Sequence, residues 1–333
     1  MAIIKPPYEA EMAAFLDVYP APKDITREFI PLMRQAPPST VTAEDVIAGE
    51  PYTHEERQIN GHGGPVTLSI FRPVQTGQAS PAITAATKLP AMYYTHGGGF
   101  LCGTRFTGTK DVLQLAKAAG AILVSVEYRL TPEHPYPSAI DDCWAGLKYV
   151  GSHAAELGID ADRLMITGSS AGGNLAAALA LIARDNNGPK LVGQLLDCPM
   201  IDDRNTTPSS KQFVEEGTWS RGSNILAWNL YLGLSAGKED VSAYAAPARC
   251  TDLSNLPPAF IGVGSTEVFR DECVSYASEL WKAGVQCELH VWPGGFHVFD
   301  GLMPEHPMSI ASNEAKTKWA VKMLARKVQQ SKL

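Results

Sequence analysis

Short apolar runs separated by stretches with helical periodicity dominate the chain from residue 90 onward. The runs cover residues 91–94, 121–126, 164–166, 191–196, 259–263 and 287–291. Such runs, alternating with helices, are typical of the buried parallel strands of βαβ units. Helices then cover both faces of the sheet, and the crossovers are right-handed. The pattern predicts an α/β fold with a mostly parallel central sheet flanked by helices.

The chain before residue 90 has a different pattern. Residues 1–50 are rich in proline and charge, and amphipathic fragments at 10–16 and 25–33 predict short helices that lie over the rest of the protein. Residues 66–71 alternate between apolar and polar positions, which predicts an edge strand. The segment 75–88 is rich in Gly, Ser, Thr and Ala and predicts a loop.

One segment breaks the alternation of strands and helices. Residues 202–244 lie between two predicted strands and are far longer than a usual connection. A long insertion that carries aromatic residues favours a helical cap over a disordered loop. We therefore expect a catalytic domain over residues 51–333 with a cap insertion at about 202–244, to which residues 1–50 contribute. Residues 311–328 predict an amphipathic last helix.

Composition and charge narrow the classes of partner. The 333 residues are 45% hydrophobic and 19% charged, which is ordinary for a globular protein. The formal net charge is −7 with no long run of one sign, so nucleic acid and anionic membrane surfaces are not expected partners. No apolar stretch reaches the ~20 residues that a membrane-spanning helix needs.

The cysteines and the two ends of the chain indicate where in the cell the protein is expected. The six cysteines are scattered without a Cys-x-x-Cys pair, which favours reduced thiols in an intracellular protein. The N-terminal residues lack a secretory pattern. The sequence ends in Ser331, Lys332 and Leu333, a tripeptide that the peroxisomal import receptor reads at an extreme C-terminus. We expect a peroxisomal location if that address is read, and a cytoplasmic one otherwise.

The sequence Gly-Ser-Ser-Ala-Gly at residues 168–172 is the strongest chemical signal. Gly-x-Ser-x-Gly forms a sharp turn from strand to helix that exposes the serine hydroxyl to a base, and the glycines leave the strained turn free of side chains. An apolar run precedes the motif and an alanine-rich run follows it, as a strand and a helix require. The motif predicts Ser170 as a nucleophile.

A serine hydroxyl needs a base, and the base needs a carboxylate that orients it. His297 follows the last predicted strand, late in the chain, where the order Ser, acid, His requires the base. The acid is expected after the preceding strand. Glu267 stands there and is favoured, while Asp271 remains the alternative; its other role is a favourable charge in the first turn of a helix.

A tetrahedral intermediate needs hydrogen-bond donors for its oxyanion. Gly97, Gly98 and Gly99 follow the strand predicted at 91–94, and glycines let backbone N–H groups approach a substrate oxygen. The N–H of Ala171, directly after the nucleophile, lies at a helix N-terminus and is a further donor. No His-Glu-x-x-His, Walker A or Gly-x-Gly-x-x-Gly motif and no zinc-type spacing is present in the sequence, so neither a metal nor an organic cofactor is expected.

At these residues the chain resembles the hormone-sensitive-lipase-like group of α/β-hydrolases. The resemblance runs from about residue 96 to the C-terminal helix. It depends on residues 96–100, 128–137, 168–173, 203–204, 244–247, 270–272 and 294–300. It implies an α/β-hydrolase fold with a cap made partly of the N-terminus, no metal or organic cofactor, and hydrolysis of short- or medium-chain carboxylic esters. It also places the nucleophile at Ser170, the acid at Glu267 and the base at His297, with the oxyanion glycines most favoured at Gly98 and Gly99.

Two residues depart from the group's usual pattern. Ser169 stands where an aspartate usually precedes the nucleophile, and Glu267 stands where the acid is usually aspartate. Glutamate serves as the acid in related hydrolases. Glu133, within the 128–137 block, is expected to brace loops and not to react.

The substrate and the second chemical step stay open in the sequence. Phe100, Trp219, Trp228 and Tyr231 are expected to line an apolar substrate pocket, with core packing as the alternative. The favoured function is a serine hydrolase that cleaves carboxylic esters through an acyl-enzyme. The alternatives are transfer of the acyl group to another acceptor, hydrolysis of a lactone or thioester, and a non-catalytic small-molecule receptor. A homodimer is compatible with the sequence.

Overall fold

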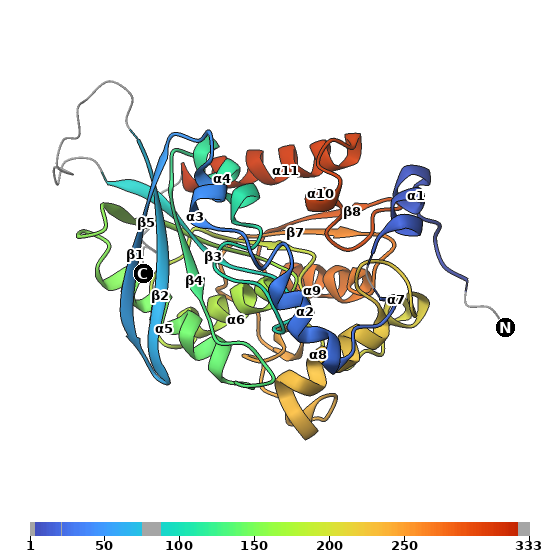
Figure 1. Ribbon diagram of the computed structural model, residues 1–333. Coiled ribbons are helices and arrows are strands. Elements are labelled where there is room, and N and C mark those ends of the chain that lie inside the picture. Colours follow the sequence, from blue (N-terminus) through green and yellow to red (C-terminus); the bar gives the residue numbers. More distant parts are fainter. Residues whose placement is uncertain (1–3, 21, 75–87, 326–333) are drawn as a thin grey trace.

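The computed structural model describes residues 4–20, 22–74 and 88–325, which form an eight-stranded sheet with helices on both faces (Figure 1). The order across the sheet is β1-β2-β4-β3-β5-β6-β7-β8. β2 is antiparallel to its neighbours, and all pairs from β4 to β8 are parallel. The mostly parallel sheet is therefore confirmed. The strands are β1 Tyr52–Gly61, β2 Gly64–Pro73, β3 Leu89–Thr95, β4 Ile122–Glu127, β5 Ile159–Ser169, β6 Gly193–Asp197, β7 Ala259–Gly264 and β8 Cys287–Trp292.

Helices cover the sheet in two layers (Figure 1). One face carries α3 (Ala43–Ile47), α4 (Thr109–Ala118) and α11 (Pro307–Leu324), and the other carries α5 (Ser138–Ser152), α6 (Ala171–Asp185) and α9 (Arg270–Lys282). Successive side chains of a strand point to opposite faces. In β3, Tyr93 packs on the side of α6, whereas Met92 and Tyr94 pack on the side of α4 and α11. Two buried cores therefore enclose the sheet.

The prediction that residues 66–71 form an edge strand is wrong, because β1 lies outside them. Those residues belong to β2, which pairs with β1 along its whole length and with β4 on its other side. In β1 only Tyr52 and Ile59 are buried. A strand that exposes most of its side chains carries too few apolar residues for its periodicity to stand out. The edge strand was therefore not found from the sequence.

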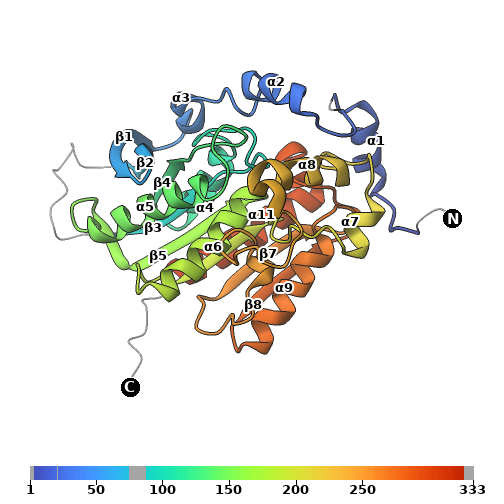
Figure 2. The same ribbon diagram turned by 90° about the horizontal axis from the view of Figure 1, so that it is seen from below.

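The N-terminal segment lies against the insertion between β6 and β7 (Figure 2). The segment contains α1 (Ala10–Val18), the 3-10 turn Arg27–Phe29 and α2 (Ile30–Gln35), so the helices predicted at 10–16 and 25–33 are present. The insertion contains α7 (Pro208–Gln212), α8 (Arg221–Leu232) and two 3-10 turns, Gly233–Ser235 and Pro247–Arg249. The backbone N–H of Ile25 donates to Ser223 Oγ over 2.9 Å, and the Lys5 ammonium pairs with Glu216.

The parallel strands end at one edge of the sheet, and the segments that carry the candidate chemistry leave from it. The glycine loop follows β3, Ser170 follows β5, and Glu267 follows β7. His297 lies between β8 and the short helix α10 (Phe299–Leu302). Most of the predicted loop at 75–88, the end of the last predicted helix and the tripeptide Ser331–Leu333 lie outside the described residues.

Candidate active site

Ser170 occupies a strained turn between β5 and α6. Its φ and ψ are 55° and −122°, in a region that residues other than glycine rarely adopt. The neighbouring glycines are required by space: a Cβ at Gly168 would lie 2.2 Å from the Gly172 carbonyl oxygen, and one at Gly172 would lie 2.0 Å from that of Thr95. The turn holds the Ser170 side chain at the N-terminal end of α6, as the motif predicts.

His297 links the serine to a carboxylate. Its Nε2 atom lies 2.9 Å from Ser170 Oγ, and its Nδ1 atom lies 3.2 Å from Glu267 Oε1. The Thr218 hydroxyl donates to the His297 carbonyl oxygen over 2.6 Å, and the Phe269 ring meets the imidazole edge-on with centroids 5.0 Å apart. The insertion therefore contacts the backbone of His297, and the loop after β7 packs against its ring.

Glu267, and not Asp271, is the carboxylate beside His297. Glu267 is buried, with only 2% of its surface exposed. Burial raises the pKa of its carboxyl, and the nearby imidazole opposes that rise. Asp271 instead accepts the backbone N–H of Ser209 over 2.7 Å and pairs with Arg270 at the start of α9. That position matches the helix-terminal role that the sequence left open for it.

The glycine loop contacts the turn that carries Ser170. A Cβ at Gly97 would lie 3.0 Å from the Ser169 carbonyl oxygen and 3.5 Å from the Cβ of Ser170. Gly98 and Gly99 have φ values of 120° and 63°, which favour glycine. His96 anchors the loop from behind, because its ring stacks on Tyr128 at 4.1 Å and its carbonyl accepts the Tyr128 hydroxyl. Ala171 is the first residue of α6, so its N–H is one of the free donors of the helix terminus.

The four aromatic residues expected at the substrate are all buried. Trp219 lies beside both parts of the site: a Cβ at Gly99 would lie 2.3 Å from its Cη2 atom, and its ring centroid is 6.4 Å from that of His297. Tyr231 stacks on Phe100 at 4.0 Å, and Trp228 packs against both rings. Trp219 therefore lies next to the candidate site, whereas Phe100, Trp228 and Tyr231 form a separate stacked group.

The structure brings Asp197 and Cys198, which were not predicted, to the site. The Asp197 carbonyl accepts the N–H of Ser170 over 2.8 Å, and its carboxylate pairs with Lys316 of α11. Cys198 Sγ lies 3.8 Å from Ser169 Oγ, beside the turn that carries the serine. A polar residue directly after a predicted parallel strand was the available signal for Asp197, because the ends of these strands meet at one edge.

Cys198, Glu267 and His297 are also a possible set of metal ligands. Their sulfur, carboxylate and imidazole donor atoms all lie within 4.8 Å of one another, and all three residues are buried. Two of these donors, the imidazole and the carboxylate, already contact each other, and the imidazole also contacts Ser170. The set therefore suits proton transfer as it stands.

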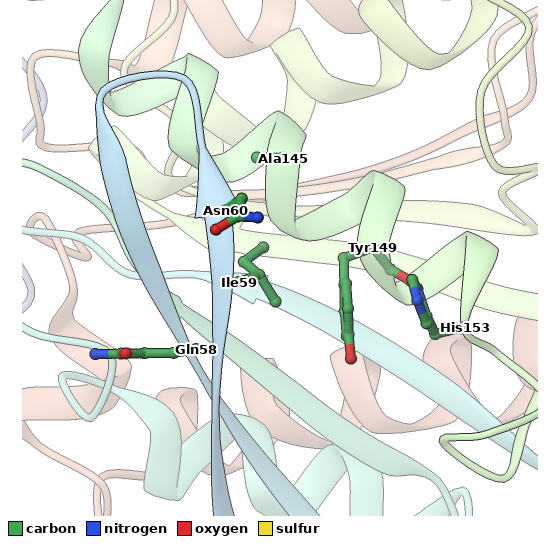
Figure 3. A pocket seen from close by; sticks show the side chains of 6 residues that line it. All are labelled: Gln58, Ile59, Asn60, Ala145, Tyr149 and His153. Carbon is green, nitrogen blue, oxygen red and sulfur yellow. The ribbon is translucent and has the colours of Figure 1, made fainter.

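A groove of about 360 Å³ lies away from these residues, between β1 and α5 (Figure 3). Gln58, Ile59 and Asn60 line it from the strand, Ala145 and Tyr149 line it from the helix, and His153 lies directly after the helix. None of them belongs to the serine turn, the glycine loop or the two loops that carry Glu267 and His297, so the groove is not part of the candidate site.

In the described part of the chain, no helix has the length and apolar character needed to cross a membrane.

Comparisons with known proteins agree with the fold. Residues 92–301 match a protein family with the alpha/beta hydrolase fold. The chain is 37% identical over 235 residues to the esterase LipI of Mycobacterium tuberculosis, a match that covers 70% of each chain. It is 43% identical over 213 residues to the carboxylesterase NlhH of the same species, covering 63% of this chain and 66% of the relative.

Solved structures extend the similarity to almost the whole chain. A bacterial heroin esterase superposes with a TM-score of 0.83 at 33% identity, covering 95% of this chain and 98% of that one. The matched family region contains the serine turn, the glycine loop and the loops that carry Glu267 and His297. The chain therefore belongs to the α/β-hydrolase fold family and is a carboxylic-ester hydrolase of its hormone-sensitive-lipase-like group.

Proposed function

We propose that Ser170, His297 and Glu267 are the catalytic triad of this esterase. The observation that carries the proposal is the chain of contacts from Ser170 Oγ to His297 Nε2 over 2.9 Å, and from His297 Nδ1 to Glu267 Oε1 over 3.2 Å. A base within hydrogen-bond reach of the serine, itself oriented by a carboxylate, is the arrangement that activates a hydroxyl nucleophile.

The reaction then runs in two halves. Ser170 Oγ attacks the ester carbonyl while His297 Nε2 takes its proton, and the imidazolium returns that proton to the leaving alcohol as the tetrahedral intermediate collapses. Water, deprotonated by His297, next attacks the acyl-enzyme and releases the acid together with the free serine. The ionised Glu267 carboxylate holds the ring in the required tautomer and stabilises the imidazolium in both halves.

We assign the oxyanion to backbone donors that converge near Ser170. The N–H groups of Gly98, Gly99 and Ala171 are the favoured donors, with Gly97 as the closest neighbour of the serine turn. The proximity of Gly97 to Ser170 Cβ supports this assignment, as does the position of Ala171 at the start of α6. Preorganised donors of this kind supply roughly 10²–10³ in rate for each one that mutation removes.

We propose small, apolar esters with short or medium acyl chains as substrates. Trp219 contributes an apolar wall beside the glycine loop and His297, which favours an apolar group on the reacting ester. Phe100, Trp228 and Tyr231 form a second apolar group, which we propose limits the space for a long chain. Among the described residues, no contact favours acyl transfer, thioester hydrolysis or a receptor function over ester hydrolysis.

The N-terminal segment and the insertion are proposed to form the cap together. Tyr8 packs against Phe213 with ring centroids 6.1 Å apart, and Gln212 donates to the Ile4 carbonyl over 2.8 Å. Thr218, in the insertion, contacts the His297 backbone. Peroxisomal import through Ser331–Leu333 and a homodimer both stay predictions, for which localisation of a tagged chain and sedimentation are the tests.

A Ser170→Ala variant tests the triad most directly. The parent is expected to hydrolyse p-nitrophenyl acetate, butyrate and octanoate with a preference for the shorter chains, and to be labelled at Ser170 by a fluorophosphonate. The variant is expected to lose both activities while it keeps the circular dichroism of the parent. Labelling of the variant at the same rate as the parent would refute Ser170 as the nucleophile.

A further inference from the structure

A small cavity next to Glu267 is otherwise lined by residues that the proposed mechanism does not use. Its volume is about 10 Å³, close to the space that one water molecule needs. Asp197, Gly262, Glu267 and Trp292 are among its lining residues. They come from the ends of β6, β7 and β8 and from the loop after β7, so rigid elements enclose the cavity.

Two buried polar atoms of this lining have no hydrogen-bond partner among the residues that the structure describes. One is Glu267 Oε2, the carboxylate oxygen that does not contact His297, and the other is Trp292 Nε1. An unpaired buried polar group costs roughly 1–3 kcal/mol. Two such atoms around one small cavity indicate that both share a partner from outside the chain.

Gly262 keeps the space between Asp197 and Trp292 open. A Cβ built on Gly262 would lie 3.5 Å from Asp197 Oδ1 and 3.8 Å from Trp292 Nε1, with no contact shorter than 3.4 Å. An atom near that position is therefore close to both polar groups. Asp197 Oδ1 is turned toward it because Lys316 binds the other oxygen, Oδ2.

The donors and acceptors around the cavity select its occupant. The indole N–H can only donate, which disfavours a cation, and the two carboxylates can only accept when ionised, which disfavours an anion. Water both accepts and donates. We propose that one water molecule occupies the cavity, accepts the N–H of Trp292 and donates to Glu267 Oε2 and Asp197 Oδ1, and that Trp292 thereby acts as a positioning residue for the catalytic acid.

This inference rests on the proposed role of Glu267 and adds a function for its second oxygen. A hydrogen bond donated to a carboxylate stabilises the ionised form. The water therefore acts together with the Gly264 backbone, which also lowers the pKa of Glu267, against the burial that raises it, and keeps the carboxylate oriented toward His297. The groups that face Glu267 from the surrounding elements are Tyr8, Asp197, Cys198, Glu272, Cys273, His297, Asp300 and, through its pair with Asp300, Lys316.

Two unrelated substitutions remove the same water. Trp292→Phe keeps an aromatic ring but lacks the N–H, and Gly262→Ala places a methyl group in the cavity without a close contact. Each is expected to lower kcat on p-nitrophenyl butyrate about tenfold at unchanged KM, because one hydrogen bond to a charged group is lost and the substrate is not touched. The acid limb of the kcat/KM profile is expected to move up by about one pH unit, since Glu267 then takes a proton more readily.

The double variant Trp292→Phe/Gly262→Ala separates this proposal from general damage. The two single changes are expected to be non-additive, so that the double variant is about as active as either single one. Trp281→Phe is the matched control, because its indole also donates one hydrogen bond, to the Cys287 carbonyl over 3.0 Å, on the outer face of α9. The control is expected to keep the pH profile of the parent.

A high-resolution crystal structure gives a readout that does not depend on activity. Density for one water within hydrogen-bond distance of Trp292 Nε1, Glu267 Oε2 and Asp197 Oδ1, absent in Gly262→Ala, is the expected result. Four results would overturn the proposal. They are a cavity without water density, additive losses of kcat in the double variant, an acid limb of the kcat/KM profile that does not move, and rates that depend on whether sodium or potassium is present. Glu267→Gln distinguishes failure of the triad assignment from failure of the water proposal. If this variant remains active, Glu267 is not the catalytic acid. If it is inactive, a negative result in the tests above concerns the water alone.

Discussion

The Nε2 atom of His297 lies 2.9 Å from the Oγ atom of Ser170, although 127 residues separate them in the chain. The contact exists because β5 and β8 are parallel strands of one sheet, so that the segments that follow them leave from the same edge. β6 and β7 lie between them and bring Asp197 and Glu267 to the same edge. Strand order thus determines which loops can share a reaction centre.

The choice between the two candidate acids leads to the first prediction. Glu267→Gln is expected to lower kcat by ~10³-fold or more, because the neutral amide neither holds the tautomer nor stabilises the imidazolium. Asp271→Asn is expected to lower kcat less than about threefold, because Asp271 contacts Ser209 and Arg270 and not the imidazole. Steady-state kinetics with p-nitrophenyl butyrate measures both.

Asp271→Asn also serves as the control for charge. Both changes replace a carboxylate by its amide after β7, so a general effect of lost negative charge would lower both rates alike. Equal losses in the two variants would contradict the assignment of the acid. A lower unfolding temperature is expected for Asp271→Asn, since Asp271 connects α9 to α7.

The glycine loop allows a matched pair of substitutions. Gly99 and Gly120 have nearly the same φ, 63° and 60°, but a Cβ at Gly99 would lie 2.3 Å from Trp219, whereas nothing lies within 4 Å of one at Gly120. Both alanine variants are expected to lose roughly 1–2 kcal/mol from the left-handed backbone. Only Gly99→Ala is expected to lose activity, by about 10²-fold, because the donors of the loop are displaced.

Unfolding by urea and kcat on a short-chain ester separate the two effects. If Gly120→Ala lost as much activity as Gly99→Ala, the loss would reflect backbone strain in general and not the position of the glycine loop. If Gly99→Ala kept full activity, the loop would not contribute the oxyanion donors.

The fold class, the family and the ester-hydrolase chemistry were predictable from the sequence because each has a local signal. The turn around Ser170 needs glycines at fixed positions, and buried parallel strands are short apolar runs. β1 was not predictable, since only Tyr52 and Ile59 of its ten residues are buried. Its place in the sheet depends on pairing with β2, which a single strand's pattern does not record.

Contacts between elements far apart in the chain could not be predicted from the sequence for the same reason. Trp219 packs next to Gly99, 120 positions earlier in the chain, and nothing in the composition of the insertion distinguishes it from Trp228. The buried Lys316 and the exposed Lys318 lie two residues apart on one helix. Only the packing of α11 on the sheet decides which of these two lysines is buried.

Arg34 connects the N-terminal segment to the glycine loop, which leads to a third prediction. Its guanidinium donates to the carbonyls of Leu101 and Thr131 over 2.8 and 2.9 Å and pairs with both oxygens of Glu133. Arg34→Gln is expected to destabilise the protein by about 1–2 kcal/mol and to lower kcat several-fold, because the chain after Gly99 loses its anchor. Glu133→Gln is expected to cost less than about 1 kcal/mol, since Glu133 is more than half exposed.

The Glu133 substitution has a defined pH dependence. The Arg34 hydrogen bonds lower the pKa of Glu133 from 4.5 to about 2. A lowered carboxyl pKa contributes stability that is fully present above 4.5 and is lost as the pH falls from there through about 2. The difference in unfolding free energy between the parent and Glu133→Gln is therefore expected to be smaller at pH 3 than at pH 7. Arg57→Gln, which breaks an exposed pair with Glu156, is the control for stability without an effect on kcat.

Lys316 gives the fourth prediction, because it is a buried cation between two carboxylates behind the site. Its ammonium lies 2.6 Å from Asp300 Oδ2 and 3.2 Å from Asp197 Oδ2. Lys316→Met is expected to cost about 3–5 kcal/mol in unfolding free energy, because the buried carboxylate of Asp300 and the half-buried one of Asp197 lose their counter-ion. Lys318→Met, on the same helix, removes an exposed pair with Glu314 and is expected to change stability by less than about 0.5 kcal/mol.

The cost of Lys316→Met is expected to shrink as the pH falls. Lys316 holds the pKa of Asp300 below its ordinary range against the burial that opposes it, so the stability from this pair is present above the ordinary aspartate pKa and is lost toward acid. Burial raises the pKa of Asp197, and the neighbouring Asp300 adds to that rise, so ionising Asp197 costs stability as the pH increases. Without the ammonium both carboxyls take up protons at higher pH, and protonation then relieves the repulsion between them. Urea unfolding of Lys316→Met and Lys318→Met at pH 5 and pH 8 measures this. A cost that stays constant between the two pH values would contradict the assignment of this stability to the charge of Lys316, because methionine keeps an apolar stem of similar length.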